Sequence, residues 1–176
     1  CSYAGKVIYG FYLKGNRDRG GAVHDIHARN IRFDTCRSAI IIDSNYKNQG
    51  SCCPPRFSRI FVQGLQASYA SDHGIYLKGW EGMHLDSVFL GEVEVESAGT
   101  PIHAEFADHL HLRDVRIGAK EYELEDGAGE SILATSPETG REVWQVSRIR
   151  PRPWPAISRG RPLPGTSAMW SMPPGR

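Results

Sequence analysis

Two residues at the ends of apolar runs, Lys14 and Tyr46, have the side chains best suited to hold a ligand. A lysine held at a strand end can meet a carboxylate or a hydroxyl group. Tyr12, two residues before Lys14, can stack on a ring. The plainer alternatives are a solvated lysine, a loop aromatic that covers the edge of the core, and a tyrosine that packs against its neighbours.

The segment that carries Lys14 occurs twice. Residues 10–15 read Gly-Phe-Tyr-Leu-Lys-Gly, and residues 74–79 read Gly-Ile-Tyr-Leu-Lys-Gly. The second copy places Lys78 where the first places Lys14, so a lysine can occupy this position without a binding role. An Arg-Gly-Gly sequence at 19–21 follows the first copy and has no counterpart after the second. This difference favours a binding role for Lys14.

A second pattern predicts stacked coils. In four places a short alternating run meets a small or polar residue and then an apolar one. The spacings between the apolar residues are 34, 23 and 27, and short strand-like runs at 39–42, 74–77 and 101–106 lie between them. Asparagine, aspartate and glycine suit tight corners because they tolerate left-handed backbone angles. The pairs are Asn30 and Ile31, Gly64 and Leu65, Ser87 and Val88, and Asp114 and Val115.

Repeats of this length, built from short strands without helical periodicity, are typical of a β-solenoid. Each coil is too small to bury its own inward side chains, so the coils stack and share one apolar interior. The alternative is an antiparallel sandwich, but the paired two-residue hairpin turns of that fold are lacking. We therefore expect an all-β parallel solenoid over residues 1–127, with the loop at 45–56 projecting from one face.

Composition limits which classes of protein and which elements the chain can form. The chain has 176 residues and a net charge of +1, which argues against a dedicated nucleic-acid binder. It holds no apolar run long enough to span a bilayer. It begins without methionine, and we expect it to be an internal piece of a longer protein. Residues 128–176 are rich in proline and arginine, and because proline cannot donate to a strand ladder we predict a poorly ordered tail.

The cysteines and histidines do not predict a metal site, and we expect no cofactor. Adjacent Cys52 and Cys53 lack the spacing of a zinc knuckle. A disulfide from Cys36 to either of them and free buried thiols are equally compatible with the sequence. His109 and His111 share a strand face, with His103 nearby, but no third ligand follows at a recognisable spacing. Asp43 and the Asp72–His73 pair have no second carboxylate placed opposite, so we assign no catalytic residue.

The motifs around Lys14 and Tyr46 resemble those of glycoside hydrolase family twenty-eight, the polygalacturonases and their relatives. In that family a Gly-x-Arg-x-Lys strand precedes a Gly-Gly turn, then an Arg-Asn-Ile segment, then a strand that ends in an active-site tyrosine. The resemblance covers about residues 10–126. It implies a right-handed parallel β-helix in which Lys14 binds the substrate carboxylate and Tyr46 lines a subsite.

Two departures qualify the resemblance. Tyr12 stands where the family has arginine, so a guanidinium fork on a uronate is lost, although a tyrosine can stack on a sugar face. The family's catalytic aspartates and its Gly-His-Gly segment lie before the lysine motif, and this chain has no matching residues. Inverting glycosidases need two carboxyl groups about 6.5–9.5 Å apart. The resemblance therefore implies the substrate-binding half of a site that lacks its acid and base.

The resemblance implies part of a polygalacturonase-like enzyme that hydrolyses pectic polysaccharide with inversion, and we expect the chain to be inactive alone. Substrate binding would fall to Lys14, Tyr46 and Tyr12. The expected partner is an acidic polysaccharide of the plant cell wall, with neither nucleic acid nor membrane involved. The full-length protein would be monomeric and secreted or periplasmic. The alternative is a non-catalytic β-helix, a glycan-binding or adhesin-type module.

Overall fold

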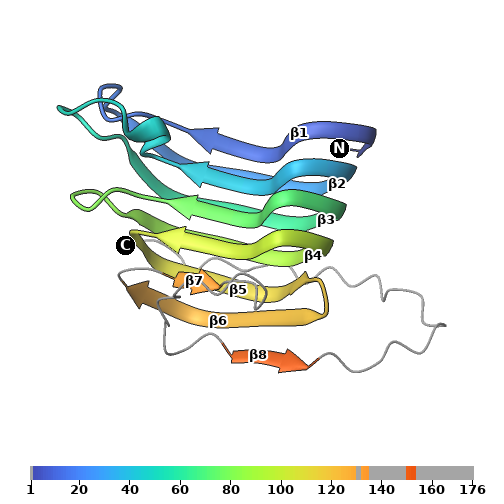
Figure 1. Cartoon of the computed structure of the whole chain (residues 1–176). Coiled ribbons are helices and arrows are strands. Elements are labelled where there is room, and N and C mark those ends of the chain that lie inside the picture. The colour runs from blue at the N-terminus through green and yellow to red at the C-terminus, as the bar shows by residue number, and fades with distance from the viewer. Residues whose placement is uncertain (1, 130–131, 135–149, 154–176) are drawn as a thin grey trace.

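A computed structural model describes residues 2–129, 132–134 and 150–153, and nearly all of them lie in β-strands (Figure 1). The part of the chain that the structure describes contains no α-helix, and therefore none long and apolar enough to cross a membrane. The elements are β1 (Ser2–Lys14), β2 (Ala22–Asp43), the single 3-10 turn η1 (Tyr46–Asn48), β3 (Arg56–Lys78), β4 (Leu85–Glu105), β5 (Ala107–Ile117), β6 (Lys120–Gly129), β7 (Ile132–Ala134) and β8 (Arg150–Pro153).

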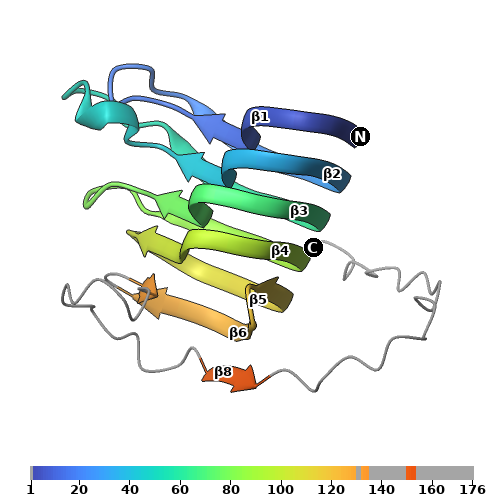
Figure 2. The same ribbon diagram turned by 45° about the vertical axis from the view of Figure 1, so that its right-hand side comes forward.

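Strands β1 to β5 stack in sequence order, and each is parallel to the next. The long strands bend so that each makes most of one coil, and the bends align from coil to coil (Figure 2). This stacking in register confirms the predicted all-β parallel solenoid. The order changes at its C-terminal end, where β6 runs antiparallel to β5, β8 to β6, and β7 to β4.

The predicted corner residues do adopt left-handed backbone angles. The φ values are 54° at Asn30, 71° at Gly64, 56° at Ser87 and 53° at Asp114. Ser87, however, belongs to a different corner from the other three, because the next residue, Val88, pairs with Ile60 rather than with Leu65. The phase predicted for that repeat was therefore wrong. Each coil therefore has two corners with left-handed residues, and not one.

The interior consists of rows of apolar side chains that run from coil to coil. Ile40, Ile75 and Ile102 form one such row, and each side chain is completely buried. The predicted strands at 39–42, 74–77 and 101–106 therefore occupy equivalent positions in successive coils. Side chains of the first coil, such as Phe11 and Leu13, are only partly buried because they have a coil on one side alone.

The glycines of the repeated segment permit a close approach between coils. A Cβ atom on Gly74 would lie 2.7 Å from the carbonyl oxygen of Pro101, and one on Gly79 would lie 2.1 Å from that of Phe106. Both contacts are with the backbone of β4 or the residue after it, which cannot rotate away as a side chain can. The recurrence of glycine at these positions thus has a steric cause.

Replacing Gly79 with alanine is expected to lower the free energy of unfolding by about 1–3 kcal/mol, the usual cost of overpacking. Gly91→Ala is the matched control, because a Cβ there would meet its nearest atom at 3.8 Å, an ordinary contact. We expect Gly91→Ala to leave stability nearly unchanged or slightly raised. Urea denaturation of both variants measures the difference, and equal stabilities would contradict the steric explanation.

Part of the segment predicted to be a poorly ordered tail forms strands. Residues 132–134 and 150–153 form the short strands β7 and β8. Pro151 and Pro153 lie in β8, which pairs with β6 alone among the described strands and so occupies an edge, where proline is tolerated. The other residues of 128–176, apart from 128 and 129 at the end of β6, lie outside the described ranges. The prediction that they are poorly ordered stays a prediction.

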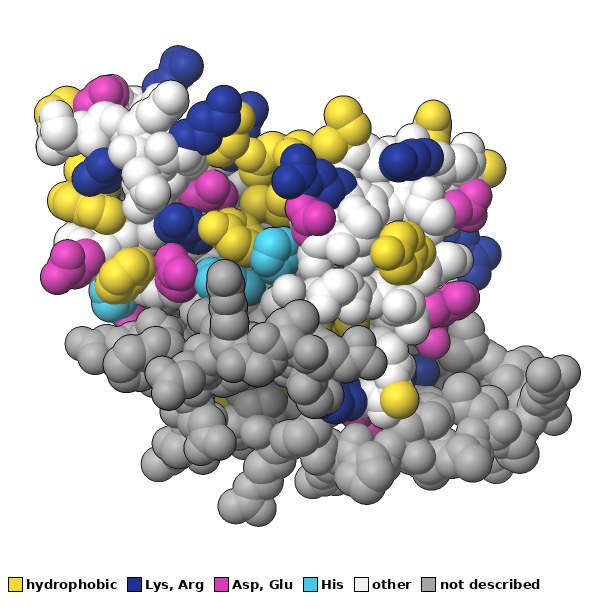
Figure 3. All heavy atoms as spheres, in the orientation of Figure 1, with side chains coloured by type: hydrophobic (Ala, Val, Ile, Leu, Met, Phe, Trp, Pro, Cys, Tyr) yellow, Lys and Arg dark blue, Asp and Glu magenta, His cyan; other side chains and the backbone are white. Residues whose placement is uncertain are grey.

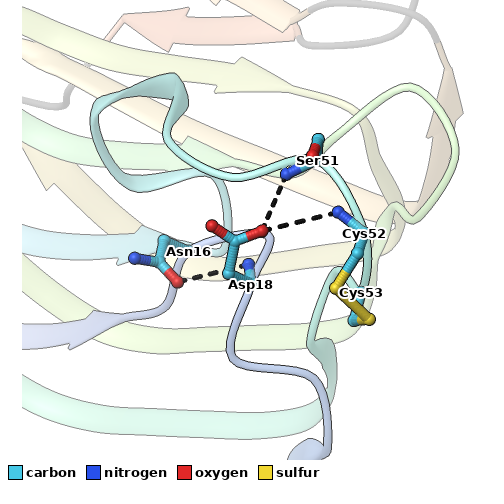
Figure 4. The surroundings of a disulfide bond; sticks show 5 residues. All are labelled: Asn16, Asp18, Ser51, Cys52 and Cys53. Carbon is cyan, nitrogen blue, oxygen red and sulfur yellow. Dashed lines mark hydrogen bonds between the residues drawn. A yellow bond between two sulfur atoms is a disulfide. The ribbon is translucent and has the colours of Figure 1, made fainter.

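Of the two arrangements predicted for the cysteines, the disulfide from Cys36 is wrong, and a free buried thiol is confirmed for Cys36 alone. Cys52 and Cys53 form a disulfide with each other, and Cys36 is a free, buried thiol whose pKa is raised by burial to about 11. Asp18, in the loop between β1 and β2, holds this disulfide loop in place (Figure 4). Its Oδ1 accepts hydrogen bonds from the backbone nitrogens of Ser51, at 2.9 Å, and Cys52, at 3.5 Å.

Candidate functional site

The ends of β1 and β2 are tied together, and this brings Lys14 and Tyr46 to the same place. Lys14 is the last residue of β1, and Tyr46 begins η1, three residues after β2 ends. The backbone nitrogen of Gly15 donates to the carbonyl oxygen of Asp43, and that of Tyr46 donates to the carbonyl oxygen of Gly15, both at 2.9 Å. Two successive chain turns are thereby locked at one edge of the solenoid.

All three side chains predicted to bind a ligand meet at this edge. The Nζ atom of Lys14 lies 4.7 Å from the ring centroid of Tyr46 and 5.5 Å from that of Tyr12. The lysine is exposed, whereas both tyrosines are partly buried. Cation–π contacts of this kind position an ammonium group without neutralising it. The arrangement is an exposed positive charge bordered by two phenol rings.

The surroundings of Tyr12 keep its hydroxyl protonated. Burial, followed by the neighbouring Tyr46 and Asp43, raises the pKa of Tyr12 to about 12. A neutral phenol can both donate and accept a hydrogen bond. Tyr12 therefore offers a ligand a hydroxyl group and part of a ring face, rather than a charge.

Lys14 begins a row of alternating charge that crosses four coils. Register places Lys14 beside Asp43, Asp43 beside Lys78, and Lys78 beside Glu105. The Nζ atom of Lys78 lies 3.9 Å from an oxygen of Glu105, and its side chain is only 20% exposed. Lys14 has no ion-pair partner among the residues that the structure describes. Of the two copies of the repeated segment, the first alone leaves its lysine available for an anion.

Asp43 is nearly buried between the two lysines. Its Oδ1 accepts a hydrogen bond of 2.9 Å from the backbone nitrogen of Asn45. Burial is the largest influence on this carboxyl group and raises its pKa, against the opposing effects of that hydrogen bond and of Lys78. The stability that Asp43 contributes is thus present below its unfolded pKa and is lost as the pH rises through its folded pKa.

We expect Asp43→Asn to stabilise the protein relative to wild type more at pH 7 than at pH 4, because the variant has no carboxylate to bury. Asp25→Asn should behave in the opposite sense. Hydrogen bonds from Arg59 and His24 lower the pKa of Asp25, so its contribution is present at neutral pH and is lost on acidification. Denaturant titrations at several pH values test the pair, and shifts of the same sign in both variants would contradict this account.

Arg17, in the turn after Lys14, makes contacts within the protein. Its guanidinium donates to the carbonyl oxygen of Asn48 at 2.7 Å and lies 5.4 Å from the ring of Trp80. Asn16 likewise caps its own turn by accepting from the backbone nitrogen of Asp18 at 3.3 Å. The contacts of Arg17 bind the two loops to each other and to the turn after β3, so they shape the edge on which Lys14 lies.

Several polar side chains on the same face were not predicted from the sequence. Tyr76 and His103 lie in the row of Tyr12, and Glu105 lies in the row of Lys14. The repeated segment held a signal for this, because it carries Tyr76 and Lys78 where the first copy carries Tyr12 and Lys14. His103 and Glu105 gave no such signal, since their place in the rows depends on the register of β4.

The three histidines considered for a metal site are not brought together. His103 stacks on Tyr76, whereas His111 stacks on Phe89 in another row, and His109 occupies a corner at φ 50°. A different group, near the C-terminal end of the solenoid, brings carboxylate oxygens within 4.8 Å of one another; its members are Asp114, Glu121 and Glu123. Clustered carboxylates of this kind are common on protein surfaces without a bound ion.

Comparison with solved structures finds a similar fold in the crystal structure of a hyperthermoactive exopolygalacturonase from Thermotoga maritima. The TM-score is 0.58, with 19% sequence identity. The match covers 77% of this chain and 29% of that one, so this chain spans less than a third of the length of its structural relative. No family model matches the sequence, and no curated protein matches it. The likeness is one of fold, and it agrees with the parallel β-helix described above.

Proposed function

We propose that this chain is the substrate-binding part of a polygalacturonase-like glycoside hydrolase that acts on pectic polysaccharide. The observation that carries the proposal is the exposed ammonium of Lys14, held between the rings of Tyr46 and Tyr12 at a strand end of a parallel β-helix. The fold shared with an exopolygalacturonase supports the same substrate class. A uronate unit carries one carboxylate on a hydroxylated ring, which matches one cation bordered by phenols.

In this proposal Lys14 binds the carboxylate of one uronate, and the tyrosines orient its ring. Tyr12 donates a hydrogen bond to a hydroxyl or carboxylate oxygen, where the family's arginine would make two charge-assisted bonds. Hydrolysis with inversion requires an acid and a base on opposite sides of the scissile bond. We expect aspartates of a longer protein to supply them, as the resemblance implies, and the 176 residues alone to be inactive.

We further propose that the full-length protein is monomeric. We also propose that it is secreted or periplasmic, because its proposed substrate is a component of the plant cell wall. Export would also suit the disulfide between Cys52 and Cys53, since such bonds persist in oxidising compartments. Fractionation of the producing cell, with immunodetection of the protein, tests the location. Recovery from the cytoplasm alone would contradict it.

The deciding experiment compares binding and turnover. The 176-residue chain is titrated calorimetrically with an oligogalacturonide and with the same oligomer after chemical reduction of its carboxyl groups. We expect binding of the acidic form alone and no release of reducing ends. The longer reading frame is then assayed on polygalacturonate, where release of reducing ends supports the enzyme. Binding without release by the longer protein would favour the alternative, a non-catalytic glycan-binding module.

A further inference from the structure

Three rings of β3 and β4 form a cluster on the face that carries Lys14. The rings of Tyr76 and His103 stack with centroids 4.9 Å apart and planes 10° apart. His73 meets both rings edge-on, with its centroid 4.9 Å from that of Tyr76 and 6.0 Å from that of His103. Two of the three rings thus stack face to face, which leaves their edges, where the polar atoms lie, outside the stacking contact.

The polar atoms of this cluster are largely unused. His103 contacts Glu105, with Nε2 3.1 Å from an oxygen of that carboxylate. Among the residues that the structure describes, neither the ring nitrogens of His73 nor the hydroxyl of Tyr76 has a hydrogen-bond partner. The side chains of His73 and Tyr76 are both partly buried. Half-buried donors and acceptors in this state are ready to bind a ligand.

Register relates the cluster directly to the proposed carboxylate site. Tyr12, Ile41, Tyr76 and His103 occupy one row across four successive coils. At about 4.8 Å for each coil, Tyr76 lies about 10 Å and His103 about 14 Å along the solenoid from Tyr12. In the view of Figure 3, histidine side chains gather near the middle of the molecule, bordered by basic, acidic and hydrophobic ones.

We propose that His73, Tyr76 and His103 form a second sugar-binding patch, which engages the part of an acidic polysaccharide chain that extends beyond the unit held at Lys14. This proposal rests on the proposed function, because it requires a chain bound at Lys14. The Tyr76 hydroxyl and the imidazole nitrogens bond to ring hydroxyls of the further units. A chain long enough to reach both places binds more tightly than one that occupies the Lys14 site alone.

The patch also makes binding depend on pH. Burial lowers the pKa of both histidines, and the two imidazoles repel each other's charge at His73. Both are therefore neutral at pH 7 and gain charge on acidification, while carboxylates of ordinary pKa stay ionised above pH 5. The charged groups around them are Asp72 and Arg37 at His73, and Glu105 and Lys78 at His103. The backbone of β7 pairs with β4 beside His103.

The test is calorimetric titration of the 176-residue chain with a short and a long oligogalacturonide, at pH 7 and at pH 5. We expect the long oligomer to bind more tightly than the short one, and its advantage to grow at pH 5. The double variant with His73→Gln and His103→Gln should lose about fivefold in affinity for the long oligomer, the scale of a lost hydrogen bond. Its affinity for the short oligomer should not change.

His111→Gln is the matched control, since His111 also stacks on an aromatic ring, Phe89, but in another row. It should leave both affinities unchanged. The patch is disproved if the double variant binds the long oligomer as wild type does while Lys14→Ala still weakens binding. Absence of binding by the wild-type chain to either oligomer would overturn the proposed function as well. Circular dichroism confirms that each variant is folded.

Discussion

Replacing Ile75 with alanine is expected to lower the free energy of unfolding by about 2–5 kcal/mol. Ile75 is completely buried between Ile40 of the coil before and Ile102 of the coil after. The hydrogen-bonded ladders on both sides fix the spacing of the coils, so the backbone cannot close the cavity that the missing atoms leave. The cost therefore includes the lost burial and an unrelaxed void.

Ile8→Ala is the control for this effect. Ile8 also lies in a strand, but its side chain is 69% exposed, so its removal should change the unfolding free energy by less than about 0.5 kcal/mol. Urea denaturation followed by circular dichroism measures both variants. Similar losses for the two would mean that the row of isoleucines does not form a packed interior.

Lys14→Ala is expected to weaken binding of an oligogalacturonide by about tenfold or more, the value of a hydrogen bond to a charged group. Its side chain is exposed and lies over two tyrosine rings, and no described residue neutralises it. Because the interaction is ionic, the difference between variant and wild type should shrink as salt is added. Lys14→Arg should retain most of the affinity, since it keeps the charge.

Lys78→Ala provides a control within the same repeat. Lys78 occupies the equivalent strand position two coils away, but it is mostly buried and paired with Glu105 at 3.9 Å. We expect its removal to affect binding far less than that of Lys14. Equal losses for the two variants would indicate general attraction between a basic surface and an anion, rather than a site at Lys14.

Much of the fold could be predicted because its signals are local. Asn30, Gly64 and Asp114 indicate corners because these residue types tolerate left-handed backbone angles. The apolar residue after each of them indicates where the chain again faces the core. The same rule misplaced Ser87, since a coil has two such corners and sequence alone does not say which one a polar residue occupies. The register of β4 settles that question.

The candidate site, like the fold, could be predicted only in part. The proximity of Lys14 and Tyr46 was expected from the resemblance, which implies one site for both, although Tyr46 lies in η1 and not at the end of β2. The pairing of Lys78 with Glu105 and the stacking of Tyr76 on His103 were not expected, since each joins residues 27 positions apart that meet only through coil register. Whether a repeated residue is available to a ligand thus depends on its neighbour in the next coil, which the repeated segment itself does not contain.

The disulfide between Cys52 and Cys53 joins neighbouring residues and therefore encloses almost no chain. Cross-links stabilise proteins mainly by shrinking the conformational freedom of the unfolded chain, and this effect grows with the length of the loop that they close. A bridge across a single peptide bond removes very little of that freedom. The solenoid should accordingly melt at nearly the same temperature with and without reductant, so its coils can assemble in a reducing compartment and the bond can form afterwards.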